Sequence, residues 1–129
     1  MSFIHYLLLG HFEHDGEVVR FAKSPSDPVY RPVIRRPLDL EAAKAILRDL
    51  KGADVGDLAF PDDWMIWLDD GYLICDKYTR NPQAIHFIAC LVQRTRCAIY
   101  DVGAHCEITL HDWLAVTHSY AQELRSVHQ

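Results

Sequence analysis

The sequence lacks the short motifs by which several protein classes are recognised. It contains no C-x-x-C pair and none of the G-x-x-x-x-G-K-[ST], G-x-G-x-x-G or G-x-S-x-G patterns. Only six glycines are present, and the longest apolar run, "YLLLG", is far shorter than the roughly 20 residues that span a bilayer. Zinc-knuckle, nucleotide-binding, serine-hydrolase and membrane-spanning classes are therefore disfavoured.

Signals for export and for disulfide formation are also missing. The stretch "MSFIHYLLLGHFEHDGE" has neither the positive flank nor the small-residue cleavage site of a secretory signal, so we expect a cytoplasmic protein. Cys75, Cys90, Cys97 and Cys106 lie in or near apolar runs such as "YLIC" and "FIAC", which favours buried free thiols. The length of 129 residues, half of them hydrophobic, predicts a single globular domain over residues 1–129.

Basic residues are absent from the centre of the chain. No Lys or Arg occurs between Gly52 and Asp76, whereas residues 20–36 carry five cationic side chains and one acid, Asp27. The central segment instead holds seven aspartates: Asp54, Asp57, Asp62, Asp63, Asp69, Asp70 and Asp76. With a formal net charge of -5, this distribution argues against a nucleic acid as partner, because phosphate binding needs a positive surface.

The apolar patterns predict three hairpins, each followed by a helix. The first hairpin has strands near 3–12 and 17–22 around Asp15-Gly16, and the second has strands near 64–68 and 72–76 around Asp70-Gly71. The third pairs "CAIYD" with "HCEI" across a "VGA" turn. The proline-rich stretch "KSPSDPVYRPVIRRP" predicts a long surface connection, since proline removes backbone donors.

Capping residues mark the helices. Asp39 and Gly52 bracket a helix over about 40–51, Asn81-Pro82 opens a second, and Thr109 opens a third that runs to about residue 127. This order predicts an α+β fold, with a mostly antiparallel sheet built from hairpins and packed with about three helices. The strand order does not follow from the sequence.

Histidines near the first turn are candidate metal ligands. His11, His14 and Asp15 offer donor atoms for Zn or Fe, but residues three apart on a strand point to opposite faces of the sheet. The hairpin interpretation therefore favours structural roles, and no metal site is assigned.

The stretch "RCAIYDVGAHCEITLHDW" gathers possible catalytic groups. Cys97 and Asp101 share a strand face, and His105 lies at the turn, so a thiol nucleophile with a base is conceivable. A structural role suffices for each except His105, because Cys97 lies in an apolar strand and Asp101 precedes a turn. The acid pairs Asp62-Asp63 and Asp69-Asp70 could serve a two-metal site, but neighbours on a strand point apart and Asp70-Gly71 is explained by the turn, so structural roles are favoured.

Acids and aromatics come together in "DVGDLAFPDDWMIWLDDGYLICD". Trp64 and Trp67 are three residues apart, so on a strand at most one of them faces the core. An aromatic side chain inside a ring of carboxylates suits a basic protein partner. The residues assigned to such a binding face are Asp57, Asp62, Asp63, Trp64, Trp67, Asp69 and Asp70.

The 35-residue stretch "RNPQAIHFIACLVQRTRCAIYDVGAHCEITLHDWL" resembles a pattern in small bacterial cytoplasmic proteins, among them immunity proteins of polymorphic and type VI secreted toxins. There an Asn-led helix runs into a strand ending in Tyr-Asp or similar, followed by a turn and a helix bearing a Trp. The resemblance implies a non-enzymatic inhibitor that blocks the active site of one cognate toxin. It carries no functional residue over to this chain.

The leading hypothesis is therefore an immunity or antitoxin protein without cofactor, whose acidic face fits a basic active-site cleft of a toxin. Two alternatives stay open: a small metal- or thiol-dependent enzyme, and a regulatory module that binds a small ligand. The sequence does not determine the partner, the oligomeric state, or the role of the basic stretch 20–36.

Overall fold

The fold is α+β, as the order of hairpins and helices predicts. The computed structural model describes residues 5–23, 30–52 and 58–117. Three helices, α1 (Leu40–Lys51), α2 (Pro82–Thr95) and a C-terminal helix described over residues 110–117, accompany a short 3₁₀ helix, η1 (Asp62–Trp64). The strands are β1 (Tyr6–Phe12), β2 (His14–Asp15), β3 (Val18–Val19), β4 (Phe21–Lys23), β5 (Tyr30–Pro32), β6 (Ile34–Arg36), β7 (Ile66–Leu68), β8 (Leu73–Asp76), β9 (Ala98–Asp101) and β10 (Cys106–Ile108).

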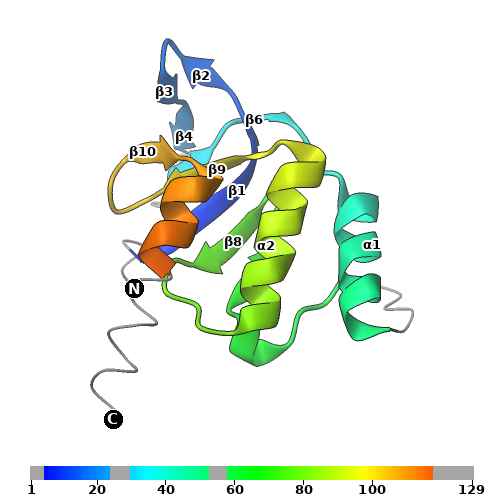
Figure 1. Cartoon of the computed structure of the whole chain (residues 1–129). Coiled ribbons are helices and arrows are strands. Elements are labelled where there is room, and N and C mark those ends of the chain that lie inside the picture. Colours follow the sequence, from blue (N-terminus) through cyan, green and yellow to red (C-terminus); the bar gives the residue numbers. More distant parts are fainter. Residues whose placement is uncertain (1–4, 24–29, 53–57, 118–129) are drawn as a thin grey trace.

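The main sheet has β1 at its centre (Figure 1). Its order is β10-β9-β1-β8-β7, with β6 pairing the far end of β1, and each of these pairings is antiparallel. The central position explains why "YLLLGHF" is apolar on both sides, since both faces of β1 are covered. The outer strands of this order are β10 and β7.

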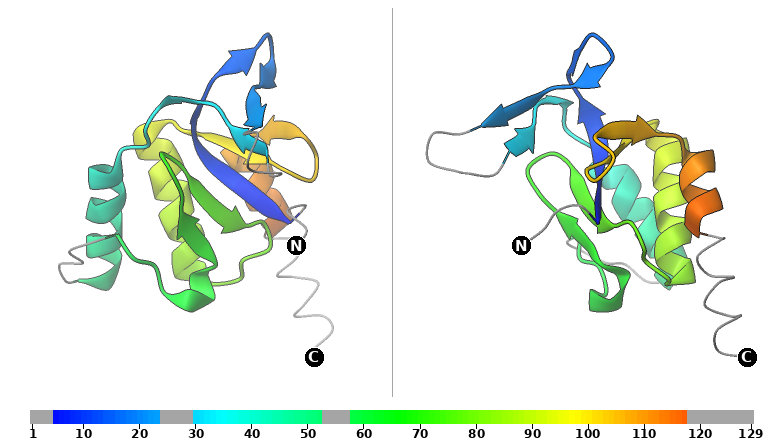
Figure 2. Two further views of the ribbon diagram at one scale, coloured as in Figure 1. Left: turned by 180° about the vertical axis from the view of Figure 1, so that it is seen from behind. Right: turned by 90° about the vertical axis from the view of Figure 1, so that its left-hand side faces the viewer.

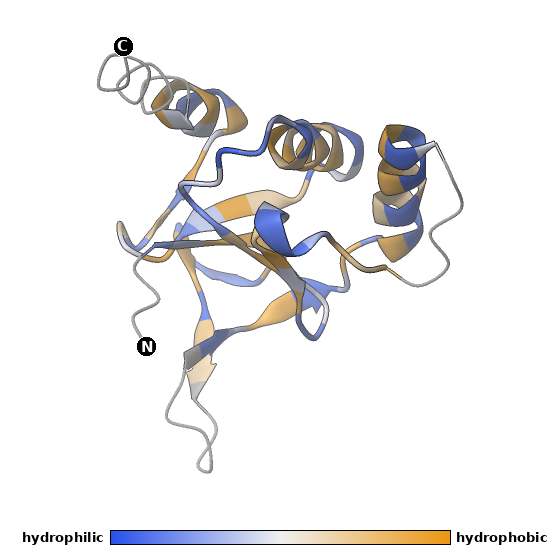
Figure 3. Cartoon of the chain, turned by 90° about the horizontal axis from the view of Figure 1, so that it is seen from below, coloured by the Kyte–Doolittle hydropathy of each residue, from blue (hydrophilic) through white to orange (hydrophobic). Residues whose placement is uncertain are grey.

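All three helices cover one face of the sheet, with α2 between α1 and the C-terminal helix (Figures 1 and 2). Seen from below, the three helices lie side by side in one layer against the sheet (Figure 3). Leu7 and Leu9 of β1 meet Phe87 and Leu91 of α2 in this core, and all four are fully buried. This layer holds most of the buried apolar surface.

The opposite face of the sheet carries a smaller cluster. Leu8 and Phe12 of β1 pack with Tyr72 and Tyr100, and Val19 of β3 closes over them. The β2-β3 and β4-β5 ribbons rise on this side of the sheet (Figure 2).

The predicted helix signals are confirmed. Asp39 accepts a hydrogen bond from the Ala42 amide, and Gly52 ends α1 in the left-handed conformation. Asn81 caps α2 with Pro82 at its first position, and the Thr109 hydroxyl accepts from the Asp112 amide at the start of the C-terminal helix. The part of that prediction beyond residue 117 lies outside the described residues.

Two sequence interpretations need correction. The proline-rich stretch is not only a connection, because β5 pairs with β4 and β6 pairs with β1. The first hairpin is short: β2 and β3 do pair around Asp15-Gly16, but β1 takes its partners from β8, β9 and β6. The β4-β5 pair is a separate two-stranded sheet, whereas β1 and β6 belong to the main sheet, whose strands come from distant parts of the chain. Within the described residues, no helix is long and apolar enough to cross a membrane.

Candidate functional site

The two central tryptophans have opposite environments. Trp64 ends η1 and is 1 % exposed, packing against Phe60 and Phe87 with ring centroids 6.3 and 6.0 Å away. Trp67 lies on β7 and is 42 % exposed, with an edge-to-face contact to Tyr6 at 5.7 Å. The expectation that at most one faces the core is confirmed. Trp64 must therefore be removed from the predicted binding face, because the core already covers its ring.

The backbone between these tryptophans explains their separation. Met65 adopts a left-handed conformation at φ 58°, and its backbone N–H donates a hydrogen bond to the carbonyl oxygen of Asp62 at 3.4 Å. This reversal ends η1 and starts β7, so Trp64 and Trp67 are not on one continuous strand. Residues other than glycine seldom adopt a positive φ, so this conformation of Met65 carries a cost in backbone strain.

Large apolar side chains gather on the surface around β7. Six such side chains are exposed in the part of the chain that the structure describes, and four of them lie between residues 65 and 78. We call the following residues the β7 surface: the apolar Met65, Trp67, Leu68 and Tyr78, and the exposed acids Asp62, Asp63 and Asp70. Exposed apolar side chains concentrated in one region are typical of interaction sites.

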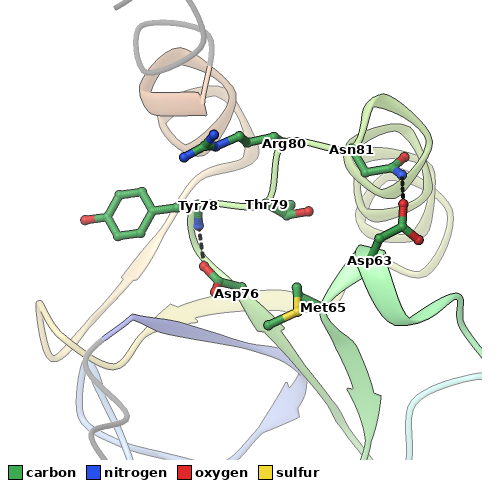
Figure 4. Close-up of a pocket in the computed structure, with 7 residues that line it drawn as sticks. All are labelled: Asp63, Met65, Asp76, Tyr78, Thr79, Arg80 and Asn81. Carbon is green, nitrogen blue, oxygen red and sulfur yellow. Dashed lines mark hydrogen bonds between the residues drawn. The ribbon is translucent and has the colours of Figure 1, made fainter. Parts of the chain in front are cut away.

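One end of the β7 surface is an open, shallow pocket of about 410 Å³ (Figure 4). The pocket is lined by Asp63, Met65, Asp76, Tyr78, Thr79, Arg80 and Asn81. Its walls are held together by hydrogen bonds: the Asn81 side-chain Nδ2 donates to Asp63 Oδ2 at 2.8 Å, and the Thr79 hydroxyl donates to the Trp64 carbonyl at 3.2 Å. These bonds fix η1, which precedes β7, to the loop that leads into α2.

The predicted acids divide into two groups at the two ends of β7. Asp62 and Asp63 are exposed on η1, and Asp70 is exposed in the turn to β8. Asp69 is already engaged, because its carboxylate accepts from the Tyr72 hydroxyl at 2.8 Å and lies 3.8 Å from the Arg31 guanidinium. Burial raises the pKa of Tyr72, and the bond to Asp69 raises it further. Asp57 lies outside the described residues.

The basic residue nearest to β7 in the sequence, Lys77, forms an ion pair within the protein. Lys77 follows β8, and its ammonium donates to Asp101 Oδ2 at 2.6 Å. The Asp101 side chain is 3 % exposed and also accepts from the Ala104 amide at 3.2 Å. The predicted turn role of Asp101 is therefore confirmed, and the partly buried ion pair with Lys77 adds a second role that the sequence did not reveal.

The candidate metal ligands near the first turn, His11 and His14, have different environments and different partners. His11 is buried on β1, and burial lowers the pKa of its imidazole, with Arg36 and Arg35 lowering it further. His14 is exposed on β2, and its Nε2 lies 2.5 Å from Glu107 Oε1 of β10. No group of three or more metal-ligating side chains occurs among the described residues.

The candidate thiol residues are not brought together either. Cys97 is buried in the core beneath the helices, and burial raises the pKa of its thiol, which disfavours the reactive thiolate. His105 is exposed in the β9-β10 turn at φ 55°, a left-handed conformation. All four cysteines are free, as predicted, but only Cys75 and Cys97 are buried.

The structure brings together a different thiol and imidazole, those of Cys90 and His86, which were not among the predicted site residues. Cys90 Sγ lies 3.4 Å from His86 Nε2 on α2, beside a shallow groove that α1 and α2 form. Their spacing of four residues on a predicted helix was the available signal, since such residues are neighbours on one helix face. Asp49 and Arg94 also line this groove.

Comparisons with known proteins give no relative: no family model, no curated protein and no solved structure matches the chain. The resemblance to immunity proteins thus remains a prediction. Support for a function comes from the residues of the β7 surface.

Proposed function

We propose that this protein is a non-enzymatic, cytoplasmic inhibitor of the immunity type, which binds a cognate protein toxin through its β7 surface. The observation that carries the proposal is the concentration of exposed apolar side chains at residues 65–78, with exposed carboxylates at both ends of β7. A half-exposed tryptophan among neighbouring apolar groups has the chemistry of an interface hot spot.

The exposed carboxylates of the β7 surface explain how such a protein would inhibit a toxin. Asp62, Asp63 and Asp70 would meet the cationic side chains of a toxin active site that normally receives an anionic substrate. Complementary charge accelerates the encounter and fixes the orientation of the two proteins. The inhibitor then occupies the cleft and excludes the substrate, without any chemical step of its own.

Charge reversal at Asp62 and Asp70 tests this function. Neither carboxylate has a side-chain partner among the hydrogen bonds and ion pairs above, whereas Asp63 holds Asn81 and is better left intact. We expect Asp62→Lys/Asp70→Lys to keep the wild-type circular dichroism and melting temperature, but to lose the stoichiometric partner in affinity capture from the source cell.

Glu17→Lys/Asp49→Lys is the matched control. Both acids are exposed, Glu17 in the β2-β3 turn and Asp49 on α1, and the two reversals change the net charge by the same amount. The control should retain the partner. Equal capture by both variants, or no stoichiometric partner for the wild type, would count against the proposed function.

A further inference from the structure

The outer edge of β7 offers unpaired backbone groups. At one end of the β7-β8 hairpin the Asp76 amide donates to the Met65 carbonyl at 3.0 Å, and at the other the Asp69 amide donates to the Tyr72 carbonyl at 2.9 Å. Antiparallel pairing alternates, so the Met65 carbonyl and the backbone groups of residues 67 and 69 are directed toward β8. The N–H and C=O groups of Ile66 and Leu68 therefore point away from the sheet.

No strand of the described residues pairs with this edge. β7 is an end of the sheet order, where it pairs with β8. Trp67 and Leu68 stand on opposite faces of β7 and are 42 % and 44 % exposed, so an added strand would contact apolar groups on both sides. β7 also lacks Lys and Pro, two common means of blocking an edge strand.

The charges around the edge of β7 indicate what kind of strand could pair with it. Asp62 and Asp63 precede β7 and Asp70 follows it, while the whole chain has a formal net charge of -5. A second copy of this chain, paired edge to edge, would bring these carboxylates together and be repelled. An extended segment that carries Lys or Arg would instead place positive charge beside the acids at each end.

We propose that β7 binds a basic, extended segment of a partner protein by strand addition, with the outward groups of Ile66 and Leu68 forming the new backbone hydrogen bonds. This inference rests on the proposed function, and it specifies how the partner is recognised. Main-chain bonds would supply affinity, and the alternating side chains of the added strand would supply specificity. The three residues of β7 span about 10 Å, so the segment would be short.

A synthetic peptide provides the probe. An acetylated and amidated peptide of about eight alternating Lys and Val residues is long enough to cover β7 and both acidic ends. Site-resolved amide exchange by NMR should show that the Ile66 and Leu68 amides exchange rapidly in the free protein and become protected with peptide. The same peptide, N-methylated at two consecutive central residues, keeps its charge but loses backbone donors, and should bind about tenfold or more weakly.

Leu68→Pro removes the outward amide without breaking a bond to β8, so the fold should survive. We expect this variant to bind the Lys-Val peptide about tenfold more weakly than Leu68→Ala, which loses the side chain but keeps the donor. Failure of excess peptide to protect the Ile66 and Leu68 amides, or equal binding of the two peptides, would overturn strand addition. A dimer of the free protein that Leu68→Pro dissociates would overturn it too, by assigning the edge to a second copy.

Different results would contradict strand addition and the proposed function. If Leu68→Pro retains the partner captured from the source cell while Asp62→Lys/Asp70→Lys loses it, strand addition is wrong and the inhibitory function stands. If the charge variant also retains that partner, the β7 surface is not its binding site and the proposed function is wrong.

Discussion

Trp64→Ala is expected to lower the free energy of unfolding by about 4 kcal/mol, whereas Trp67→Ala lowers it by about 1 kcal/mol or less. Trp64 is 1 % exposed and fills the space beside Phe60 and Phe87, so its removal leaves a cavity that the core cannot fully close. Trp67 already has 42 % of its surface in water and loses mainly its contact with Tyr6. Urea denaturation of the two variants measures the difference.

This pair of variants is its own control, because both delete the same side chain three residues apart. A Trp64→Phe variant should recover part of the loss, since a phenyl ring fills some of the cavity. If both alanine variants lost the same stability, the separation of the tryptophans into core and surface would be wrong. Trp67 would then not be the exposed aromatic anchor of the β7 surface.

Lys77→Met is expected to lower the free energy of unfolding by about 3 kcal/mol. Asp101 would remain as a buried carboxylate, with the Ala104 amide as its remaining hydrogen-bond donor among the contacts described. The double variant Lys77→Met/Asp101→Asn should be more stable than the single variant, because no unpaired charge is left in the interior. Chemical denaturation at neutral pH compares all three proteins.

The ion pair also predicts a pH dependence. The hydrogen bond to Asp101 raises the pKa of Lys77 above its ordinary value of 10.5. A raised pKa in the folded state means that the pair stabilises at neutral pH and loses this contribution as the pH rises above about 10.5. The stability difference between wild type and Lys77→Met should therefore narrow in that alkaline range. A difference that stays constant there would show that lost packing, not charge pairing, explains the effect.

Local signals predicted the helices well. Asp39, Gly52, Asn81 and Pro82 act through bonds or backbone angles within a few residues, so their effect is visible in the sequence. The turns at Gly16 and Gly71 have the same character, since both glycines adopt positive φ. The order of strands in the sheet could not be predicted from such local signals. The position of β1 at the centre depends on pairings with β8 and β9, which come from distant parts of the chain.

The candidate site was predicted in part. The spacing of Trp64 and Trp67 indicated that one would face outward, but the identity of the exposed ring depends on η1 and the left-handed Met65. The exposure of Met65 and Leu68 was missed because both belong to an apolar run that resembles a buried strand. Asp101 and His14 find their partners 24 and 93 residues away, beyond the reach of local patterns.

The most direct test of the β7 surface is the affinity of Trp67→Ala for the partner captured from the source cell, measured by calorimetry. Val116→Ala is the control, because Val116 is similarly exposed but lies on the C-terminal helix. We predict that Trp67→Ala weakens binding by about 2 kcal/mol, roughly thirtyfold, while Val116→Ala changes it little. Equal affinity of both variants and the wild type would contradict the assignment of Trp67 as the centre of the binding site.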